Sequence, residues 1–274
     1  MRFSWPKGET CAVLLSFEFD AESVEWGYKR TISGADDIGG FSPKFGIPRI
    51  LEVLNKYRIK ATFFVPGWDA ERYPRSVREI VEEGHEVAAH GYVHEDLSRL
   101  DAGEETEVFR KTHDLLREIA GTPPCGFRAG AYNTPLSPHT LAILQNLDYL
   151  YDSSFLDHDL PYRISLDGKT TKLIEIPWSW PLNDIVFASP PISCGLGYVL
   201  PPRTPGWILE YWKEEFESLF TEVGFFHLVM HPRDMGRGSR IPILDGLLDF
   251  MRGRSIWFAT CRELAEWCSG QLET

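Results

Sequence analysis

Apolar runs of strand length alternate along this chain with longer segments whose apolar residues recur at helical spacing. The short runs predict strands over 11–20, 61–65, 86–90, 126–130, 149–153, 173–177, 225–231 and 256–259. The segments of helical spacing predict helices over 47–57, 76–83, 104–120, 137–146, 206–223, 243–251 and from 262 onward. An aromatic, proline-rich segment over 178–205 interrupts the alternation.

Repeated strand–helix units predict parallel strands, because each helix returns the chain to the same end of the sheet. About seven or eight such units in 274 residues predict an α/β fold whose sheet is a closed or nearly closed barrel. A hydrophobic content of 43% is enough to fill a large core. The chain has no linker, repeat or low-complexity segment, so we expect residues 1–274 to form one domain.

The formal net charge of −12 argues against nucleic acids and anionic membranes as partners, since both bind basic surfaces. The five cysteines are odd in number and form no CxxC motif, so the sequence predicts neither a disulfide framework nor a zinc ribbon. No apolar leader opens the sequence, and no stretch is long enough to span a bilayer. We therefore expect a cytoplasmic protein.

Unusual polar and aromatic residues fall where the predicted strands end. They are Glu18, Asp20, His90, Arg128, Asp152, Trp178 and His231. Singly, each has a structural explanation: Arg128 as an ion pair at the rim, Asp152 as a helix N-cap, Trp178 as packing. Together they line the carboxyl ends of the strands, which is where barrel enzymes keep their active sites.

Two histidines, His90 and His94, stand four residues apart in the sequence EVAAHGYVHED. This spacing lets both imidazoles reach one metal ion, although in a helix it is also typical of a polar surface. Glu18 and Asp20 lie on the same side of their strand, because side chains alternate along a strand. Two His and one Asp would make a first-row metal site with positions open for water and substrate.

The order of these motifs resembles the polysaccharide deacetylase family (NodB-homology, carbohydrate esterase 4) over nearly the whole chain. The matching segments are EFD (18–20), ATFFVPG (61–67), GHEVAAHGYVH (84–94), FRAG (127–130), YDSS (151–154) and HP (231–232). The segment GIPRIL (46–51) and the late His-Pro are most similar to the branch with peptidoglycan deacetylase-like proteins, cyclic imide hydrolases and metal-independent allantoinases. The resemblance implies a distorted (β/α)7-type barrel and hydrolysis of an amide-type C–N bond.

Carried onto this sequence, the resemblance makes Asp20, His90 and His94 the ligands of zinc or another divalent transition metal. It makes Glu18 the group that takes the proton from the attacking water. The family usually has Asp at that position, so three interpretations of Glu18 stay open: a base with longer reach, a metal ligand, or a sign of a different substrate.

The resemblance assigns the remaining catalytic roles to three residues. Arg128 matches the arginine that pairs with the base and keeps it ionised. His231 matches the general acid that protonates the leaving amine, with Asp152 as the partner that orients it. We expect an Arg128→Met variant to fold normally. His227, deeper on the same strand as His231, is expected to be structural.

The sequence departs from the family in its third motif, which here is RAGAY (128–132). The amide that would stabilise the oxyanion is therefore that of Ala131 or Tyr132. Aromatic residues at 26–28, Trp68 and 178–180 are either a wall for a sugar or imide ring or part of the core.

Two classes of function follow. The first is a metal-dependent hydrolase, acting as a deacetylase of an N-acetylated sugar or peptidoglycan-type substrate, or alternatively on a small cyclic imide or ureide. The second is a catalytically drifted member that only binds a metal or ligand. The aromatic segment over 177–205, with Trp178, Trp180, Phe187 and Tyr198, must cover the barrel mouth or pack on a neighbour, and we expect a homo-oligomer.

Overall fold

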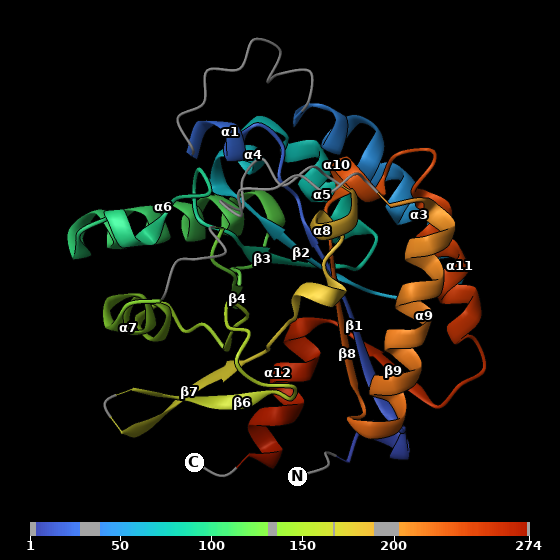
Figure 1. The fold of residues 1–274 in the computed structure, drawn as a ribbon. Helices are drawn as coiled ribbons and strands as arrows, with labels where there is room; N and C mark the ends of the chain where they lie inside the picture. Colours follow the sequence, from blue (N-terminus) through green and yellow to red (C-terminus); the bar gives the residue numbers. More distant parts are fainter. Residues whose placement is uncertain (1–3, 28–38, 131–135, 167, 189–202, 273–274) are drawn as a thin grey trace.

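Nine strands form one mixed sheet in the computed structural model, which describes residues 4–27, 39–130, 136–166, 168–188 and 203–272 (Figure 1). Along the sheet the order is β6-β7-β5-β4-β3-β2-β1-β8, and β9 also pairs with β1. The strands are β1 (Cys11–Glu18), β2 (Thr62–Val65), β3 (Glu86–Ala89), β4 (Gly126–Phe127), β5 (Tyr151–Asp152), β6 (Tyr162–Leu166), β7 (Lys169–Glu175), β8 (Phe225–Met230) and β9 (Ile256–Ala259).

Strand β1 lies at the centre of the fold, between β8 on one side and, on the other, β9 near its start and β2 near its end. All eight of its residues are buried, as are those of β2, β3 and β8. Strands buried on both faces need apolar residues at nearly every position, which explains the continuous apolar runs in the sequence. Every described pairing is parallel except the hairpin between β6 and β7.

Helices surround the sheet on its outer side (Figure 1). The longer ones are α3 (Ile47–Tyr57), α5 (Pro74–Glu82), α6 (Ala102–Ala120), α7 (Pro138–Asn146), α9 (Pro205–Glu222), α11 (Ile241–Met251) and α12 (Cys261–Gln271). Short helices follow several strands at their carboxyl ends: α1 (Ser23–Gly27), α4 (Gly67–Arg72), α8 (Ile185–Ala188) and α10 (Pro232–Met235). Helical turns occur at η1 (Pro6–Gly8), η2 (Ser42–Gly46), η3 (Leu97–Arg99) and η4 (Trp180–Leu182). Of the described helices, none has both the length and the apolar composition needed to cross a membrane.

The predicted α/β fold with a distorted barrel is confirmed, and among the described strands the barrel is open on one side, as a half-barrel. The strand β6 was not predicted, because its sequence YRISL leaves several residues partly exposed and lacks a continuous apolar run. Its antiparallel hairpin with β7 replaces another strand–helix unit. Between β7 and β8 the described chain makes only a single bridge, from Asn183 to Val229 of β8.

The four described cysteines are buried and free. Cys194 lies outside the described residues. So do Tyr28, Ala131, Tyr132, Tyr198 and much of the aromatic segment over 177–205.

Candidate active site

The polar residues predicted at the strand ends meet at one end of the sheet. They are Glu18 at the end of β1, Asp20 just beyond it, His90 and His94 after β3, Arg128 after β4, and His231 after β8. Each of the six exposes 3% of its surface or less. Parallel strands place their carboxyl ends at the same edge, which is why residues so far apart in sequence converge here.

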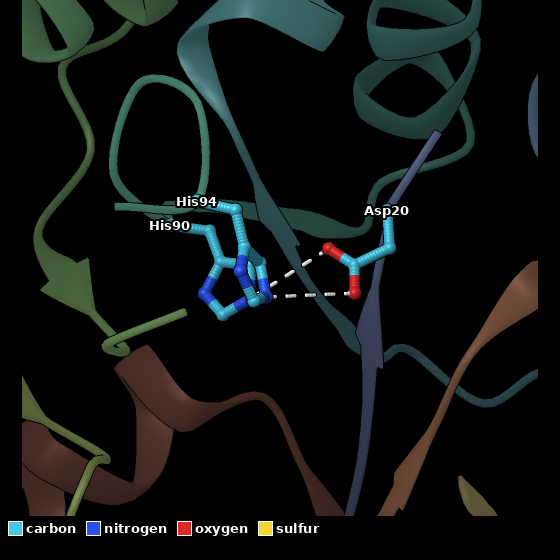
Figure 2. A group of neighbouring side chains, drawn as sticks. All are labelled: Asp20, His90 and His94. Carbon is cyan, nitrogen blue, oxygen red and sulfur yellow. Dashed lines mark ion pairs between the residues drawn. The ribbon is translucent and has the colours of Figure 1, made fainter. Parts of the chain in front are cut away.

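Asp20, His90 and His94 form a compact group with both imidazoles directed at the carboxylate (Figure 2). The Nε2 atom of His90 lies 3.7 Å from Oδ1 of Asp20, and Nε2 of His94 lies 3.9 Å from Oδ2. Ligand atoms at zinc distances in a tetrahedral site are about 3.4 Å apart. These side chains are therefore already spaced for one ion.

The bonding of this group also fits a cation. Asp20 Oδ1 and His90 Nε2 are buried and have no hydrogen-bond partner, which is costly for polar atoms. The Nδ1 atom of His90 donates to the carbonyl oxygen of Arg128 at 2.8 Å, so the Nε2 lone pair points at Asp20. Burial alone would lower the pKa of His90, but the carboxylates of Glu18 and Asp20 outweigh it and raise the pKa. The position favours a positive charge.

The turn that carries Asp20 is held in a conformation that few residues adopt, with φ at 35°. Asp69 fixes the turn from behind: its carboxylate accepts from the backbone N–H of Ala21 at 3.0 Å and of Ser23 at 3.1 Å. On the other side, the hydroxyl of Ser42 donates to the carbonyl of Phe19 at 2.5 Å. The carboxylate of Asp20 is thus aimed by bonds on both sides of its own residue.

The loop of His94 is fixed in a similar way. His94 has φ at 59°, again in the left-handed region. The carboxylate of Glu95 accepts from the N–H groups of Tyr92 and Val93, both at 2.9 Å. The His94 ring packs against Gly130, where a Cβ atom would lie 2.7 Å from its Cγ atom. Only glycine leaves room for the imidazole at this point.

Glu18 lies between the candidate ligands and two cationic groups. Its Oε1 accepts from Arg128 at 3.2 Å, and its Oε2 lies 3.0 Å from Nε2 of His231 and 3.7 Å from Nε2 of His90. Burial by itself would raise the pKa of Glu18, but His231 and His90 reverse this and hold the pKa well below its usual range. Glu18 is therefore a carboxylate that stays ionised in a buried site.

Arg128 donates hydrogen bonds from each of its three guanidinium nitrogens. Its Nε donates to the carbonyl of Ser153 at 3.0 Å, and its Nη2 donates to the Ser153 hydroxyl at 2.8 Å and faces His227 at 3.2 Å. Its Nη1 donates to the Ser16 hydroxyl and to Glu18 at 3.1 and 3.2 Å. Each of the three guanidinium nitrogens therefore donates to at least one acceptor, which fixes the orientation of Arg128 towards Glu18.

His227 supports Arg128 as a neutral imidazole. Its Nδ1 donates to the carbonyl oxygen of Pro177 at 3.0 Å, so Nε2 carries the lone pair and accepts from Ser16 at 2.9 Å or from Arg128. Burial and the nearby guanidinium lower the pKa of His227 to about 3. His227 is predicted to be structural, and its contacts are consistent with this: it lies against Arg128 and Ser16 and helps to hold Arg128 in place.

The neutral His227 should make the protein sensitive to acid. Its folded pKa of about 3 lies below the usual 6.5, so its contribution to stability is complete above pH 6.5 and is lost as the pH falls towards 3. Between pH 7 and pH 4 the loss amounts to about 3 kcal/mol of unfolding free energy. We expect urea unfolding of His227→Gln, which keeps an acceptor near Arg128, to depend less on pH by that amount. Equal slopes for parent and variant would contradict the assignment.

Asp184, and not Asp152, is the partner of His231. Asp184 Oδ1 lies 2.7 Å from Nδ1 of His231, and its Oδ2 accepts from the backbone N–H of the same residue at 2.8 Å. Burial would lower the pKa of His231, but Asp184 and Glu18 raise it well above its usual value. The structure thus presents His231 as an imidazolium between two carboxylates.

The prediction that Asp152 orients His231 is wrong, because both ring nitrogens of His231 face other carboxylates. Asp152 lies at the end of β5, where its oxygens accept from the N–H and hydroxyl of Ser154. In the parallel register it stands beside Glu175 of β7. Burial raises the pKa of both acids, and their proximity raises that of Glu175 well above its usual range.

Asp184 was not among the predicted site residues. It follows the aromatic turn η4, and its backbone N–H donates to the carbonyl of Val229 in β8 at 3.1 Å. This hydrogen bond, with the bridge from Asn183 to Val229, places Asp184 at the end of β8, beside His231. The only local signal is a polar pair, Asn183 and Asp184, inside an otherwise apolar stretch.

The aromatic residues considered for a substrate wall divide into two groups. Trp178 is 5% exposed and packs edge to face with Trp180, so Trp178 belongs to the core. Trp26 is 62% exposed and lies beside Trp68. The predicted oxyanion amides, of Ala131 or Tyr132, lie outside the described residues.

The sequence is similar to a known protein family and to individual members of it. Residues 36–151 match the family model described as polysaccharide deacetylase. The peptidoglycan deacetylase of Helicobacter pylori is 28% identical over 290 residues, which cover 93% of this chain and 95% of that protein. A peptidoglycan deacetylase-like protein of Gibberella zeae is also 28% identical, over 92% of this chain and 85% of its own length.

Solved structures agree with the sequence comparison. The crystal structure of a candidate polysaccharide deacetylase from Mycobacterium smegmatis is 32% identical, covers 99% of this chain and 95% of its own, and has a TM-score of 0.86. The structure of Puue allantoinase, at 22% identity and a TM-score of 0.83 over 98% of this chain and 94% of its own, shares the fold. The identity to the mycobacterial protein extends over essentially both chains. The chain therefore belongs to the polysaccharide deacetylase family, whose members are hydrolases of carbon–nitrogen bonds other than peptide bonds.

Proposed function

We propose that this protein is a metal-dependent deacetylase that removes the acetyl group from an N-acetylated sugar, as found in peptidoglycan-type substrates. The observation that supports this most directly is the buried group Asp20, His90 and His94 with an ionised Glu18 and a protonated His231 beside it. A divalent ion held by the three ligands would supply Lewis-acid polarisation of the acetamide carbonyl and of the attacking water.

In this proposal Glu18 and His231, beside the three candidate ligands, each carry out one of the two proton transfers. Glu18, kept ionised in the buried site, takes the proton from the attacking water. Arg128 holds the Glu18 carboxylate in one orientation through its Nη1 atom. His231, kept protonated, gives its proton to the amine as the C–N bond breaks, and Asp184 fixes the ring for that transfer. The site thus holds an ionised carboxylate and a protonated imidazole side by side, which are the starting states of these two proton transfers.

A substrate panel tests this proposal. Purified, metal-loaded protein is assayed for acetate release from N-acetylglucosamine oligomers and peptidoglycan fragments, and for ring opening of succinimide-type imides and allantoin. We expect acetate from the sugars and no ring opening. Turnover of an imide or ureide alone would replace the proposal with the alternative, and tight metal binding without any turnover would favour a binding protein. The allantoinase likeness, at 22% identity, supports the fold alone.

Binding of the metal should raise the free energy of unfolding. We expect one divalent ion per chain, zinc above others given the His and carboxylate ligands. An ion at 100 times its Kd raises the unfolding free energy by about 2.7 kcal/mol. Elemental analysis and thermal melts with and without zinc measure the stoichiometry and the shift.

His94→Ala should lose most of this shift, whereas His139→Ala, which changes an exposed histidine on α7, should keep it. An equal zinc shift in the parent and in His94→Ala would place the ion elsewhere. Loss of the shift in Glu18→Gln as well would make Glu18 a ligand, in the second group of potential ligands that it forms with Asp20 and His231.

We further propose that residues 1–274 act as one domain, since strands from both ends of the chain belong to the same sheet. A homo-oligomer and a cytoplasmic location complete the proposal. Light scattering tests the assembly, and a mass near 31.3 kDa at micromolar concentration would contradict the oligomer.

A further inference from the structure

Two carboxyl groups lie side by side at the ends of neighbouring strands of the sheet. Asp152 ends β5 and Glu175 ends β7, and the two residues are paired in the parallel register. Residues paired in this way direct their side chains to the same face of a sheet. Both are fully buried, and their carboxyl groups lie within hydrogen-bonding reach of each other. The proposed hydrolysis uses neither of them.

Three of the four oxygens of this pair accept hydrogen bonds from the loop that follows β5. Oδ2 of Asp152 accepts from the N–H of Ser154 at 3.0 Å, and Oδ1 accepts from its hydroxyl at 2.8 Å. Oε1 of Glu175 accepts from the N–H of Phe155 at 2.9 Å. Oε2 of Glu175 is buried and receives no hydrogen bond from a described residue. A buried carboxylate oxygen in this state is costly, whereas a proton on it can be donated to Asp152.

The surrounding charges favour one proton in the pair. Two adjacent buried carboxylates cannot both stay ionised, because no water screens one charge from the other. Burial raises the pKa of both acids, and the charge of Asp152 raises that of Glu175 further. Arg128, after β4, favours the ionised form of Asp152. The exposed Asp157, which accepts from the hydroxyl of Tyr162 at 2.8 Å, disfavours the ionised form of Glu175. These influences favour the proton on Glu175 and the negative charge on Asp152.

Asp152 is connected to the candidate site through one serine and one peptide group. The hydroxyl of Ser154 that donates to Asp152 also accepts from the backbone N–H of Ala129 at 2.9 Å. The carbonyl of the same peptide group, that of Arg128, accepts from Nδ1 of His90 at 2.8 Å. A continuous chain of hydrogen bonds therefore joins Asp152 to a candidate metal ligand. Each donor in this chain points towards Asp152.

We propose that Asp152 and Glu175 hold one proton between them and that Asp152, through Ser154, is a positioning residue for His90. The inference rests on the proposed function, since it concerns a ligand of the proposed ion. The negative charge of Asp152 polarises each bond of the chain in turn. The chain thereby keeps the proton of His90 on Nδ1 and makes Nε2 a stronger ligand.

The shared proton is tested by infrared difference spectroscopy at neutral pH. A protonated carboxyl absorbs separately from a carboxylate, so the parent should show a carboxyl band that Glu175→Gln lacks. Glutamine keeps the acceptor for Phe155 and offers Asp152 an N–H in place of the proton. Asp69, whose pKa burial raises to about 7, contributes equally to both spectra. The control Asp159→Asn changes an exposed carboxylate and should keep the band. A parent without the Glu175 band would overturn the shared proton.

The positioning role is tested by zinc affinity, measured in competition with a chelator, which needs no turnover. Ser154→Ala removes the acceptor of the Ala129 N–H and should weaken zinc binding about tenfold, as expected for a group that orients a ligand. Asp152→Ala, which also removes the charge, should weaken it at least as much. Glu175→Gln should keep the parent affinity, because its amide replaces the proton. The control Ser218→Ala changes an exposed serine on α9 and should have no effect. Unchanged affinity in Ser154→Ala, or an equal loss in Glu175→Gln, would overturn the role.

Failure of this inference is distinguishable from failure of the proposed function. If Ser154→Ala binds zinc more weakly than the parent but the parent hydrolyses no acetylated sugar, the deacetylase activity is wrong and the role of Asp152 stands. If the parent hydrolyses the sugar and Ser154→Ala binds zinc as tightly, the activity stands and the role is wrong. A parent that binds no zinc overturns both the metal dependence and the positioning role.

Discussion

Glu18→Gln is expected to lower kcat about 10²–10⁴-fold, the size that general-base catalysis supplies, while the metal content stays at one ion per chain. Glutamine keeps the shape of Glu18 and an oxygen that accepts from Arg128, but it cannot take a proton. Steady-state kinetics on the acetylated sugar, with elemental analysis of the same sample, measure both quantities.

The control for this prediction is Glu18→Asp. It keeps the carboxylate and restores the residue that the family usually has, so it should retain far more activity than Glu18→Gln. Two results would count against Glu18 as the base: a Glu18→Gln variant as active as the parent, or one that has lost its metal. The second result would identify Glu18 as a ligand.

The sequence predicted most of the site because its residues follow strands directly. The apolar runs that end at Glu18 and Ala89 mark buried strands, and parallel buried strands must present their carboxyl ends together. The positions of Asp20, His90 and His231 at one edge follow from that geometry. Helix boundaries such as those of α3, at Ile47 and Tyr57, could be read from apolar spacing alone.

The partner of His231 could not be predicted, because its position depends on a contact between a loop and strand β8. That contact is a single bridge outside the regular strands. Asp184 reaches His231 through the bridge of Asn183 to β8, and no periodic pattern in the sequence records that bridge. The resemblance assigned this role to Asp152, but the strand that Asp152 ends lies between β4 and β7, away from β8. The sequence therefore predicted the edge of the sheet at which His231 lies, but not which carboxylate lies beside it.

The burial of Arg128 changes an expectation about its variants. From sequence, Arg128→Met was expected to fold normally. The guanidinium donates to Ser16, Glu18 and Ser153 and faces His227, so methionine would leave several buried polar groups without partners. Removing one partner of a buried ion pair costs about 3–5 kcal/mol. We now expect this variant to be destabilised, and Glu18→Gln is the cleaner test of the site.

His231→Asn is expected to lower kcat on an acetylated sugar about 10²–10⁴-fold, because the leaving amine must gain a proton as the C–N bond breaks. Asp184→Asn should have a smaller effect, about 10–100-fold, since it removes only the group that orients the ring. The pKa of His231 is raised above its usual value, partly by Asp184, so the parent should stay active until the pH rises through that raised pKa. Without the Asp184 carboxylate this alkaline limit should move to lower pH. The pH–rate profiles of parent and Asp184→Asn measure the shift.

The leaving group provides the control that separates acid from base. An acetate ester of 4-nitrophenol releases a phenolate that needs no proton, so His231→Asn should lose little activity on it, whereas Glu18→Gln should still lose most. This difference cannot come from a general loss of structure, because misfolding would lower both activities alike in either variant. If His231→Asn were equally impaired on the amide and on the ester, His231 would stabilise Glu18 or the ligands instead of protonating the amine. Its 3.0 Å contact with Glu18 would then be its main function.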